Sequence, residues 1–335
     1  MEILQLELKK IITAPAIWAF VILCAIFNLF VFFGDGTYAP ETAEPPNVFA
    51  GYQTESIAET YIRVLNFDGR IAAATRKKYA ALQPVIEQKA QGGDSLGQYT
   101  YWQHRSIFAD TLKAVLYEGG ILAALIMLLA LGYENASRTE QCIYAAKTGR
   151  AIVWHKLAAA LLAAQGCYAI IALTSIITIY SSYRDIWREN VSSAANFIQD
   201  YYAGSRPFAT WHSFTVGGYL WAVVGIAAGI VVCFSLLAFA VGTASRNSYA
   251  GFMVLFMIVV SCVFIPWVMP NNNYLAFAFT YTPVLLSMKL PLWFTDGGAD
   301  VLGRNFETWG LVISLAALSA IAFFAVCKLK RRDII

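Results

Sequence analysis

Apolar stretches without a single charged residue recur along this chain, and each is long enough to cross a lipid bilayer. The hydrocarbon core of a bilayer is about 30 Å thick, which a helix crosses in about 20 residues. Five windows contain no Asp, Glu, Lys or Arg: 14–33, 157–180, 213–245, 247–288 and 308–327. A sixth window, 112–133, is apolar from Gly119 onward but carries Lys113 and Glu118 near its start. A charge at the bilayer centre costs about 2.5–3.5 kcal/mol on insertion scales, so we expect these two at the interface and six membrane-spanning helices in all.

The first 13 residues show a different periodicity. Apolar positions fall near one helical face and polar positions nearer the other: Ile3, Leu4, Leu8, Ile11 and Ile12 against Glu2, Gln5, Lys9 and Lys10. This spacing predicts a short amphipathic helix on the membrane surface, with Pro15 permitting a turn into the first span. The alternative, the first turns of one long tilted span, stays open. A secretory signal peptide is not expected, because acidic residues precede the apolar run and the run is too long.

The window 247–288 is long enough for two spans, but a seventh span would send the basic C-terminal tail to the other side of the membrane. We therefore expect 250–269 to cross, 270–273 to turn, and 274–294 to dip partway back as a re-entrant segment. Non-helical backbone at that depth is tolerated only where protein covers it, which points weakly to an oligomer.

Charge placement predicts the orientation. Hydrophobic residues make up 59% of the chain and charged residues 13%, well below the roughly 25% charged residues of soluble proteins. With six spans both termini share one side, and the segments on that side hold 11 of the 24 lysines and arginines but only five of the 21 acidic residues. The positive-inside rule puts both termini in the cytoplasm of a cell that we expect to be bacterial. A net charge of +3 is too small to indicate a nucleic-acid partner.

The fold class predicted is an all-α integral membrane protein. Its expected elements, in chain order, are an amphipathic helix (1–13), TM1 (14–33), an extracellular helical insert (34–111), TM2 (112–133), a cytoplasmic loop (134–156), TM3 (157–180), an extracellular loop (181–212), TM4 (213–243), TM5 (250–269), an extracellular or re-entrant segment (270–307), TM6 (308–327) and a cytoplasmic tail (328–335).

The insert 34–111 begins Pro-rich and then turns helical. Asp68 stands at an N-cap position before 69–91, where apolar residues recur at helical intervals until Gly92 and Gly93. An insert shorter than about 80 residues is not expected to be an independent enzyme, and we interpret it as a helical cap on the outer mouth. All six cysteines lie in expected spans or on the inner side, so no disulfide framework is expected to stabilise this cap.

Motifs for catalysis or cofactor binding are missing from the sequence. Nucleotide hydrolysis needs a Gly-x-x-x-x-Gly-Lys-Ser/Thr loop, and the nearest Gly-rich run, 92–97, lacks the lysine. The three histidines are isolated from one another and no Cys-x-x-Cys motif occurs, so no metal site is expected. Proton-coupled transporters place ionisable groups in the middle of the membrane, and here only Glu118 approaches such a position, near the outer end of its helix. We expect no enzyme and no cofactor on this chain.

The longest expected inner loop, 134–156, is the most informative segment. Its polar and apolar residues alternate at helical spacing: Ile143, Ala146 and Arg150 on one side, and Glu140, Lys147 and Thr148 on another. Such a helix, parallel to the membrane, fits the groove of a cytoplasmic partner. A connector that hugs the membrane fits the pattern equally well. Glu134, at the membrane boundary, is expected to pair with Lys9 or Lys10.

At this loop the chain resembles the membrane subunits (permeases) of ABC transporters of the type 2 export class. The family has an elbow helix before span one, six spans, a coupling helix in the first inner loop, re-entrant helices before span six and a basic tail. The matching residues of the loop are Glu134, Thr139, Glu140, Gly149, Arg150 and Lys156. Two positions depart from the family pattern, Arg138 and His155, where small residues are usual, which puts the docking contacts in doubt.

The resemblance implies a partner and a mechanism. The partner is a separate ABC ATPase subunit that carries ATP and Mg²⁺, and the complete machine holds two permease copies, identical or different, in membrane lipid. Related permeases export antibiotics, antimicrobial peptides, lipids or polysaccharides, and some confer resistance. The alternative class is a membrane receptor or sensor, whose outer cap binds a ligand and whose inner loop recruits a signalling protein.

Overall fold

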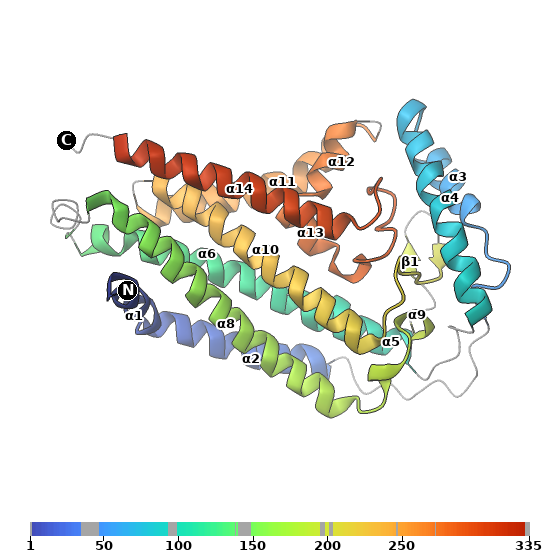
Figure 1. Cartoon of the computed structure of the whole chain (residues 1–335), viewed down its shortest axis with the longest axis horizontal. Coiled ribbons are helices and arrows are strands. Elements are labelled where there is room, and N and C mark those ends of the chain that lie inside the picture. The colour runs from blue at the N-terminus through green and yellow to red at the C-terminus, as the bar shows by residue number, and fades with distance from the viewer. Residues whose placement is uncertain are drawn as a thin grey trace.

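Six long helices run side by side in the computed structural model, which describes residues 2–34, 47–92, 99–137, 139, 149–194, 198–200, 204–245, 247–271 and 273–331 (Figure 1). Six helices in this part of the chain are long and apolar enough to cross a membrane, as the sequence predicts. They are α2 (Pro15–Gly34), α6 (Leu112–Ala136), α8 (Ile152–Ser182), α10 (Val216–Ala244), α11 (Ser248–Val268) and α14 (Phe306–Arg331).

The helix that ends in α6 begins earlier than expected. It starts at α5 (Tyr101–His104) and continues through a π-helical stretch, η1 (Arg105–Thr111), so that the apolar helix covers Tyr101–Glu134. A capping box at Thr100 and Gln103 starts it, because each side chain bonds the backbone N–H of the other residue.

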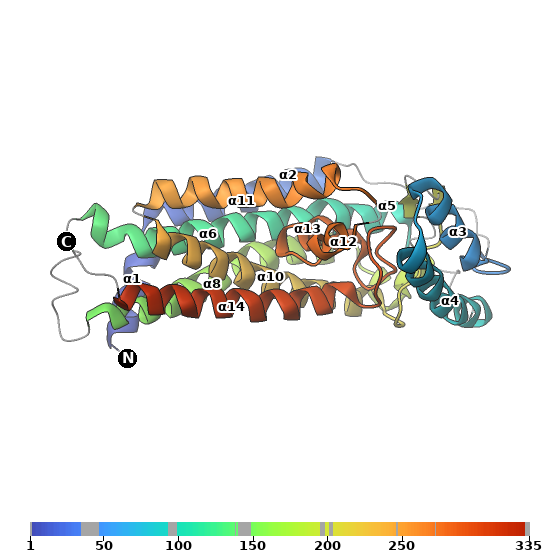
Figure 2. The ribbon, with the colours of Figure 1, turned by 90° about the horizontal axis from the view of Figure 1, so that it is seen from above.

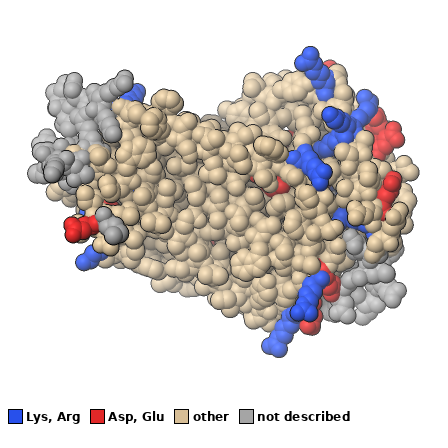
Figure 3. Space-filling model, viewed as in Figure 1, with Lys and Arg blue, Asp and Glu red and all other residues tan. Residues whose placement is uncertain are grey.

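Charged side chains gather at the two ends of the elongated molecule. On the face in Figure 3, the stretch between the ends is almost entirely uncharged. We call the end that holds the N-terminal helix α1 (Glu2–Ile12) and the last turn of α14 the α1 end, and the opposite end the α4 end (Figure 1). This distribution, together with the six apolar helices, is that of a multi-pass membrane protein.

Helices α6 and α10 form the centre of the bundle. α10 packs against α6, α8, α11 and α14, and α6 packs against α8 as well. Small residues let these helices approach closely: a Cβ at Gly119 would lie 2.7 Å from Tyr168 Cδ2, and one at Gly229 would lie 2.6 Å from Leu311 Cδ2. Side chains larger than glycine at these two positions would push the helices apart.

Three helices lie at the periphery of the bundle. Only 11% of the apolar window of α11 and 28% of those of α2 and α14 are buried, against 67% for Tyr101–Glu134. The outward residues of α11 are large and apolar; Trp267 and Val268 are 85% and 82% exposed. In Figure 2, α11 and α2 lie on the same side of the molecule. This face is covered by lipid or by protein when the chain is in a membrane.

α1 lies across α8 and α6 and contacts both. Much of the apolar face expected from the sequence is packed, since Ile11 is buried and Leu4 and Leu8 pack against the core. Two residues depart from the expectation: Ile12 is 45% exposed, and Glu7 is buried. A carboxylate therefore occupies the centre of the packed face, and the reason is the ion network described below.

The α4 end carries a helical hairpin, α3 (Thr54–Leu65) and α4 (Gly69–Gly92). α4 agrees within one residue with the helix expected over 69–91. Asn66, with φ 53°, ends α3 in the left-handed conformation that allows the sharp reversal into α4. The hairpin packs around an apolar core that includes Tyr61, Tyr79 and Ile86 and that it shares with Trp211 and Phe277.

Short elements fill the rest of the α4 end. They are η3 (Ile186–Arg188), α9 (Val191–Ala194), the antiparallel strands β1 (Ile198–Asp200) and β2 (Gly204–Arg206), α12 (Tyr274–Thr280), α13 (Pro283–Met288) and η4 (Leu290–Leu292). The fold is all-helical, as the sequence predicts, apart from these two three-residue strands. The expected segment 274–294 contains two short helices, whose first N–H groups are capped by Asn273 and Thr282.

Candidate functional site

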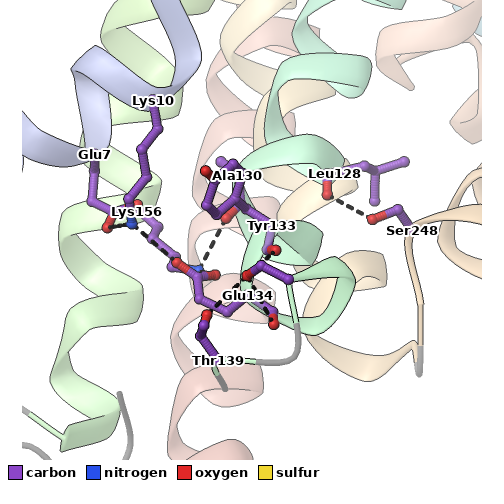
Figure 4. A network of polar contacts seen from close by, with 10 residues as sticks. Glu7, Lys10, Leu128, Ala130, Tyr133, Glu134, Thr139, Lys156 and Ser248 are labelled. Carbon is purple, nitrogen blue, oxygen red and sulfur yellow. Dashed lines mark hydrogen bonds and ion pairs between the residues drawn. The ribbon is translucent and has the colours of Figure 1, made fainter. Parts of the chain in front are cut away.

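A buried ion network lies at the α1 end, where the two ends of the inner loop meet (Figure 4). Glu134, near the end of α6, pairs with Lys156, in the first turns of α8. Lys156 Nζ also donates a hydrogen bond of 3.0 Å to the carbonyl of Ala130, one turn before Glu134. Glu134 and Lys156 are only 4% and 5% exposed, so this pair joins α6 to α8 out of contact with water.

α1 completes the network. Lys10 Nζ lies 2.6 Å from a carboxylate oxygen of Glu7 and 3.2 Å from one of Glu134. It also lies 5.3 Å from the centre of the Tyr133 ring, within cation–π range. The predicted contact of Glu134 with the N-terminal helix is thus made by Lys10, whereas Lys9 is exposed. We call Glu7, Lys10, Glu134 and Lys156 the α1-end network.

Two acids and two lysines balance within this network. Buried charges are tolerated when each is paired and hydrogen-bonded, and the removal of one partner leaves another charge uncompensated. The network therefore fixes α1, the end of α6 and the start of α8 as one unit. Both ends of the loop 134–156 are held by it, and the first span α2 follows directly from α1.

Two more residues of the predicted coupling set, Thr139 and Gly149, are described by the structure, and neither contributes a side chain to this network. Thr139 is exposed; its N–H donates to the Glu134 carbonyl at 2.9 Å, and its hydroxyl lies 2.8 Å from that of Ser137. Gly149 opens a single 3₁₀ turn, η2 (Gly149–Ala151), with a positive φ of 49° that suits glycine. Glu140 and the helix expected between 139 and 150 lie outside the described residues, as does the side chain of Arg150.

A groove of about 630 Å³ runs between α2, α6 and α11 beside the network. Its walls are apolar side chains such as Phe20, Leu125 and Phe252. At its α1 end, Ser248 Oγ of α11 donates to the carbonyl of Leu128 on α6 at 3.0 Å (Figure 4). This hydrogen bond is a polar link between the peripheral helix α11 and the central helix α6.

A second buried charge cluster lies at the α4 end, and the sequence reasoning missed it. Arg206 of β2 donates to Asp296 at 2.6 Å, and the Tyr79 hydroxyl donates to the other carboxylate oxygen of Asp296. Lys78 Nζ donates to the carbonyls of Asp296, Gly298 and Val301 at 3.2, 2.8 and 2.7 Å. We call Lys78, Tyr79, Arg206 and Asp296 the α4-end cluster; it fastens α4 to the segment between η4 and α14.

Burial and neighbouring charges shift the titration of this cluster. Burial lowers the pKa of Lys78 to about 8, against the opposing charge of Asp296. Burial alone would raise the pKa of Asp296, but Arg206 and Lys78 outweigh it and lower that pKa to about 2. Burial and the Asp296 charge raise the pKa of Tyr79 well above its ordinary value. Arg206 and Asp296 are therefore both charged at neutral pH.

Within the described residues, no group of three or more His, Cys, Asp or Glu side chains is arranged to hold a metal ion. The α1-end network joins three helices, and the α4-end cluster joins α4 to β2 and to the segment between η4 and α14. In both clusters, ion pairs and hydrogen bonds hold elements of the fold together.

Comparison of the chain with protein-family models, with curated proteins and with solved structures found no match.

Proposed function

We propose that the chain is the permease subunit of an ATP-driven exporter of the ABC type, with a separate ATPase bound at the α1 end. The observation that carries the proposal is the α1-end network, because it joins both ends of the loop 134–156 to α1. A force on this loop would move α6 and α8 directly and α2 through α1. This chain carries no motif for ATP hydrolysis, so the energy comes from the partner.

The two kinds of residue in the coupling set have different roles in this proposal. Glu134 and Lys156 are buried and act inside the permease, where they keep the loop ends together. Thr139, which is exposed, and the loop residues Glu140 and Arg150 contact the ATPase. Gly149 supplies the turn that leads from the loop back into α8. The α1 end then faces the cytoplasm, with the basic tail on the same side.

The peripheral face of α2 and α11 is the surface on which we expect the second permease copy. It exposes large apolar side chains along both helices, among them Phe30, Phe256 and Met257. The groove between α2, α6 and α11 would receive side chains of the second copy. The substrate path would lie between the copies, and the hairpin α3–α4 would cover its outer mouth. An antimicrobial peptide, another antibiotic or a lipid is the substrate class we expect.

Co-purification tests this function. The chain is expressed with the proteins encoded by the neighbouring genes, and the variants Arg150→Glu and Glu140→Lys are compared with Arg188→Glu. Arg188 is an exposed arginine of η3 at the α4 end, so it matches the change in charge but not the location. We expect both loop variants to insert normally and to lose ATPase binding or substrate-stimulated ATP hydrolysis, while Arg188→Glu keeps both.

Two results would contradict the proposal. Full binding and full activity of both loop variants would remove the coupling assignment. Recovery of a kinase or a transcriptional regulator in place of an ATPase would favour a sensor.

A further inference from the structure

Glu118 places a carboxyl group inside the bundle, apart from both charged clusters. Glu118 of α6 is 9% exposed and belongs to the apolar helix Tyr101–Glu134. The amide of Asn28, on α2, donates a hydrogen bond of 2.7 Å to one of its carboxyl oxygens. Asn28 is itself only 3% exposed. This is a polar contact between two helices of the membrane-spanning bundle.

Among the described residues, the groups around Glu118 include no compensating charge. The groups that face its carboxyl from α2 are the Asn28 amide and the Cys24 thiol, both neutral. On α8 the neighbouring Tyr168, which packs beside Gly119, donates its hydroxyl to the carbonyl of Val224. On α6 itself the ammonium of Lys113 lies over the Tyr117 ring at 5.9 Å. An ionised carboxylate without a cation is costly at this depth.

The hydrogen bonds of Asn28 are incomplete in the same place. Its carbonyl oxygen Oδ1 is buried and accepts no hydrogen bond from the residues that the structure describes. Exchanging the amide oxygen and nitrogen does not help, because a carboxylate has no hydrogen to donate to either arrangement. A proton on Glu118 supplies the missing donor. The acid O–H then donates to the amide oxygen while the amide N–H donates to the acid carbonyl, and both groups are satisfied.

We propose that Glu118 carries a proton in the folded protein and forms a closed carboxylic acid–amide pair with Asn28, which fastens α2 to α6 within the membrane. The site is a proton-binding site, and no ATPase is needed for it. Because α2 is held at one end through α1 and the α1-end network, this pair is a second fastening further along the same helix. Ionisation of Glu118 would break the pair and loosen that part of α2.

The test is infrared spectroscopy of the purified full-length chain at neutral pH. A protonated carboxyl absorbs in a C=O stretching region that carboxylates and amides leave empty. We expect a band there that Glu118→Gln abolishes and that shifts in deuterated buffer. Glu59→Gln serves as the matched control, because Glu59 is an exposed carboxylate on α3 and its replacement should leave the band unchanged.

Thermal unfolding provides a second test, because the two variants are expected to differ in melting temperature. Glutamine can form the same closed pair with Asn28, so Glu118→Gln should keep the melting temperature of the wild type. Glutamine does not ionise, so the variant should also lose the fall in melting temperature that ionisation of Glu118 causes at alkaline pH. Asn28→Leu should lower the melting temperature. An identical infrared spectrum in wild type and Glu118→Gln would overturn the proposal, and so would a loss of stability in Glu118→Gln as large as that in Asn28→Leu.

Discussion

Both ends of the bundle contain buried charged side chains, and these charges are neutralised by different partners at each end. At the α1 end, two carboxylates and two ammonium groups pair across three helices, and Lys10 stays 30% exposed in its side chain. At the α4 end, the single carboxylate of Asp296 lies between two cations, and backbone carbonyls complete the shell of Lys78. The first arrangement is a balanced ionic network, while the second depends on one acid.

The difference shows what each end can transmit. The α1-end network joins the two ends of the loop 134–156 to each other and to α1, whose Lys10 lies 124 positions before Glu134. It therefore makes the loop ends and the first span one unit. The α4-end cluster connects segments up to 223 positions apart, because Lys78 reaches Val301. It attaches the hairpin α3–α4 to the segment that leads into α14. One cluster is suited to passing on a force, and the other to keeping a cap in place.

The largest effect is expected from Asp296→Ala. The change leaves Arg206 and Lys78 buried without their shared carboxylate, and breaking a buried pair in this way costs about 3–5 kcal/mol. Hydrogen exchange should rise along 54–92, as the hairpin leaves the bundle, while α6 and α10 stay protected. Asp300→Ala is the matched control in the same loop, since the side chain of Asp300 is 60% exposed in its pair with Lys289. Its replacement should lower the free energy of unfolding by less than about 1 kcal/mol. Equal exchange in the two variants would show that the cluster does not hold the hairpin.

Lys156→Met should have the next largest effect. It removes one of the two cations that face Glu134, but Lys10 remains as a partner, so we expect a loss of about 2–3 kcal/mol in unfolding free energy. The double variant with Glu134→Gln should recover part of this loss, because no carboxylate is then left without its lysine. Denaturant unfolding of the wild type, the two single variants and the double variant measures the interaction free energy of the two side chains. Strictly additive losses would mean that the two side chains do not interact.

Strong acid should weaken the α4 end. The folded-state pKa of Asp296 is lowered to about 2 from 3.8, so its stabilisation is complete above pH 3.8 and is lost as the pH falls towards 2. The whole effect is about 2 kcal/mol. Hydrogen exchange of the hairpin α3–α4 should therefore accelerate across this window in the wild type. In Asp296→Asn the hairpin should already exchange faster at neutral pH, with this acid step absent; persistence of the step would assign it to another carboxyl.

Ser248→Ala is the smallest of the four changes. It removes the hydrogen bond to the Leu128 carbonyl that joins α11 to α6, which is worth about 1 kcal/mol. The melting temperature should fall slightly and by more than in Ser182→Ala, whose hydroxyl bonds only within its own helix on the exposed surface. No difference between the two serine variants would show that the link to α6 is not needed to hold α11.

The bundle was predictable from the sequence, and so was part of the α1 end. Uncharged windows specify the membrane helices because lipid excludes charge over about 20 residues. Glu134 and Lys156 border two successive spans, so their meeting follows from the topology. The burial of Glu7 could not be predicted from the sequence, because an acidic residue in an amphipathic helix is expected on its solvent-exposed side. Its burial depends on Lys10, which the structure turns towards α6.

The α4-end cluster was beyond reach of local patterns. The sequences around Lys78 and Arg206 are polar, so both side chains are expected at the solvent-exposed surface. Nothing near either residue in the chain indicates Asp296 as their partner. The pairing arises from the fold of the end segments, after α4, β2 and the loop following η4 have come together. The strands β1 and β2 were missed for a related reason, because three residues are too few to show an alternating pattern.

The orientation of the two ends in the membrane is the claim on which the account depends, and accessibility of single cysteines measures it most directly. Ser137 and Gln88 are exposed residues at the α1 end and on α4, and each is replaced by cysteine in a chain whose native cysteines have been removed. A membrane-impermeant maleimide applied to intact cells should label position 88 at once and position 137 only after permeabilisation. Labelling of position 137 from outside, with position 88 protected, would place the α1 end away from the cytoplasm and would contradict the coupling of this end to an ATPase.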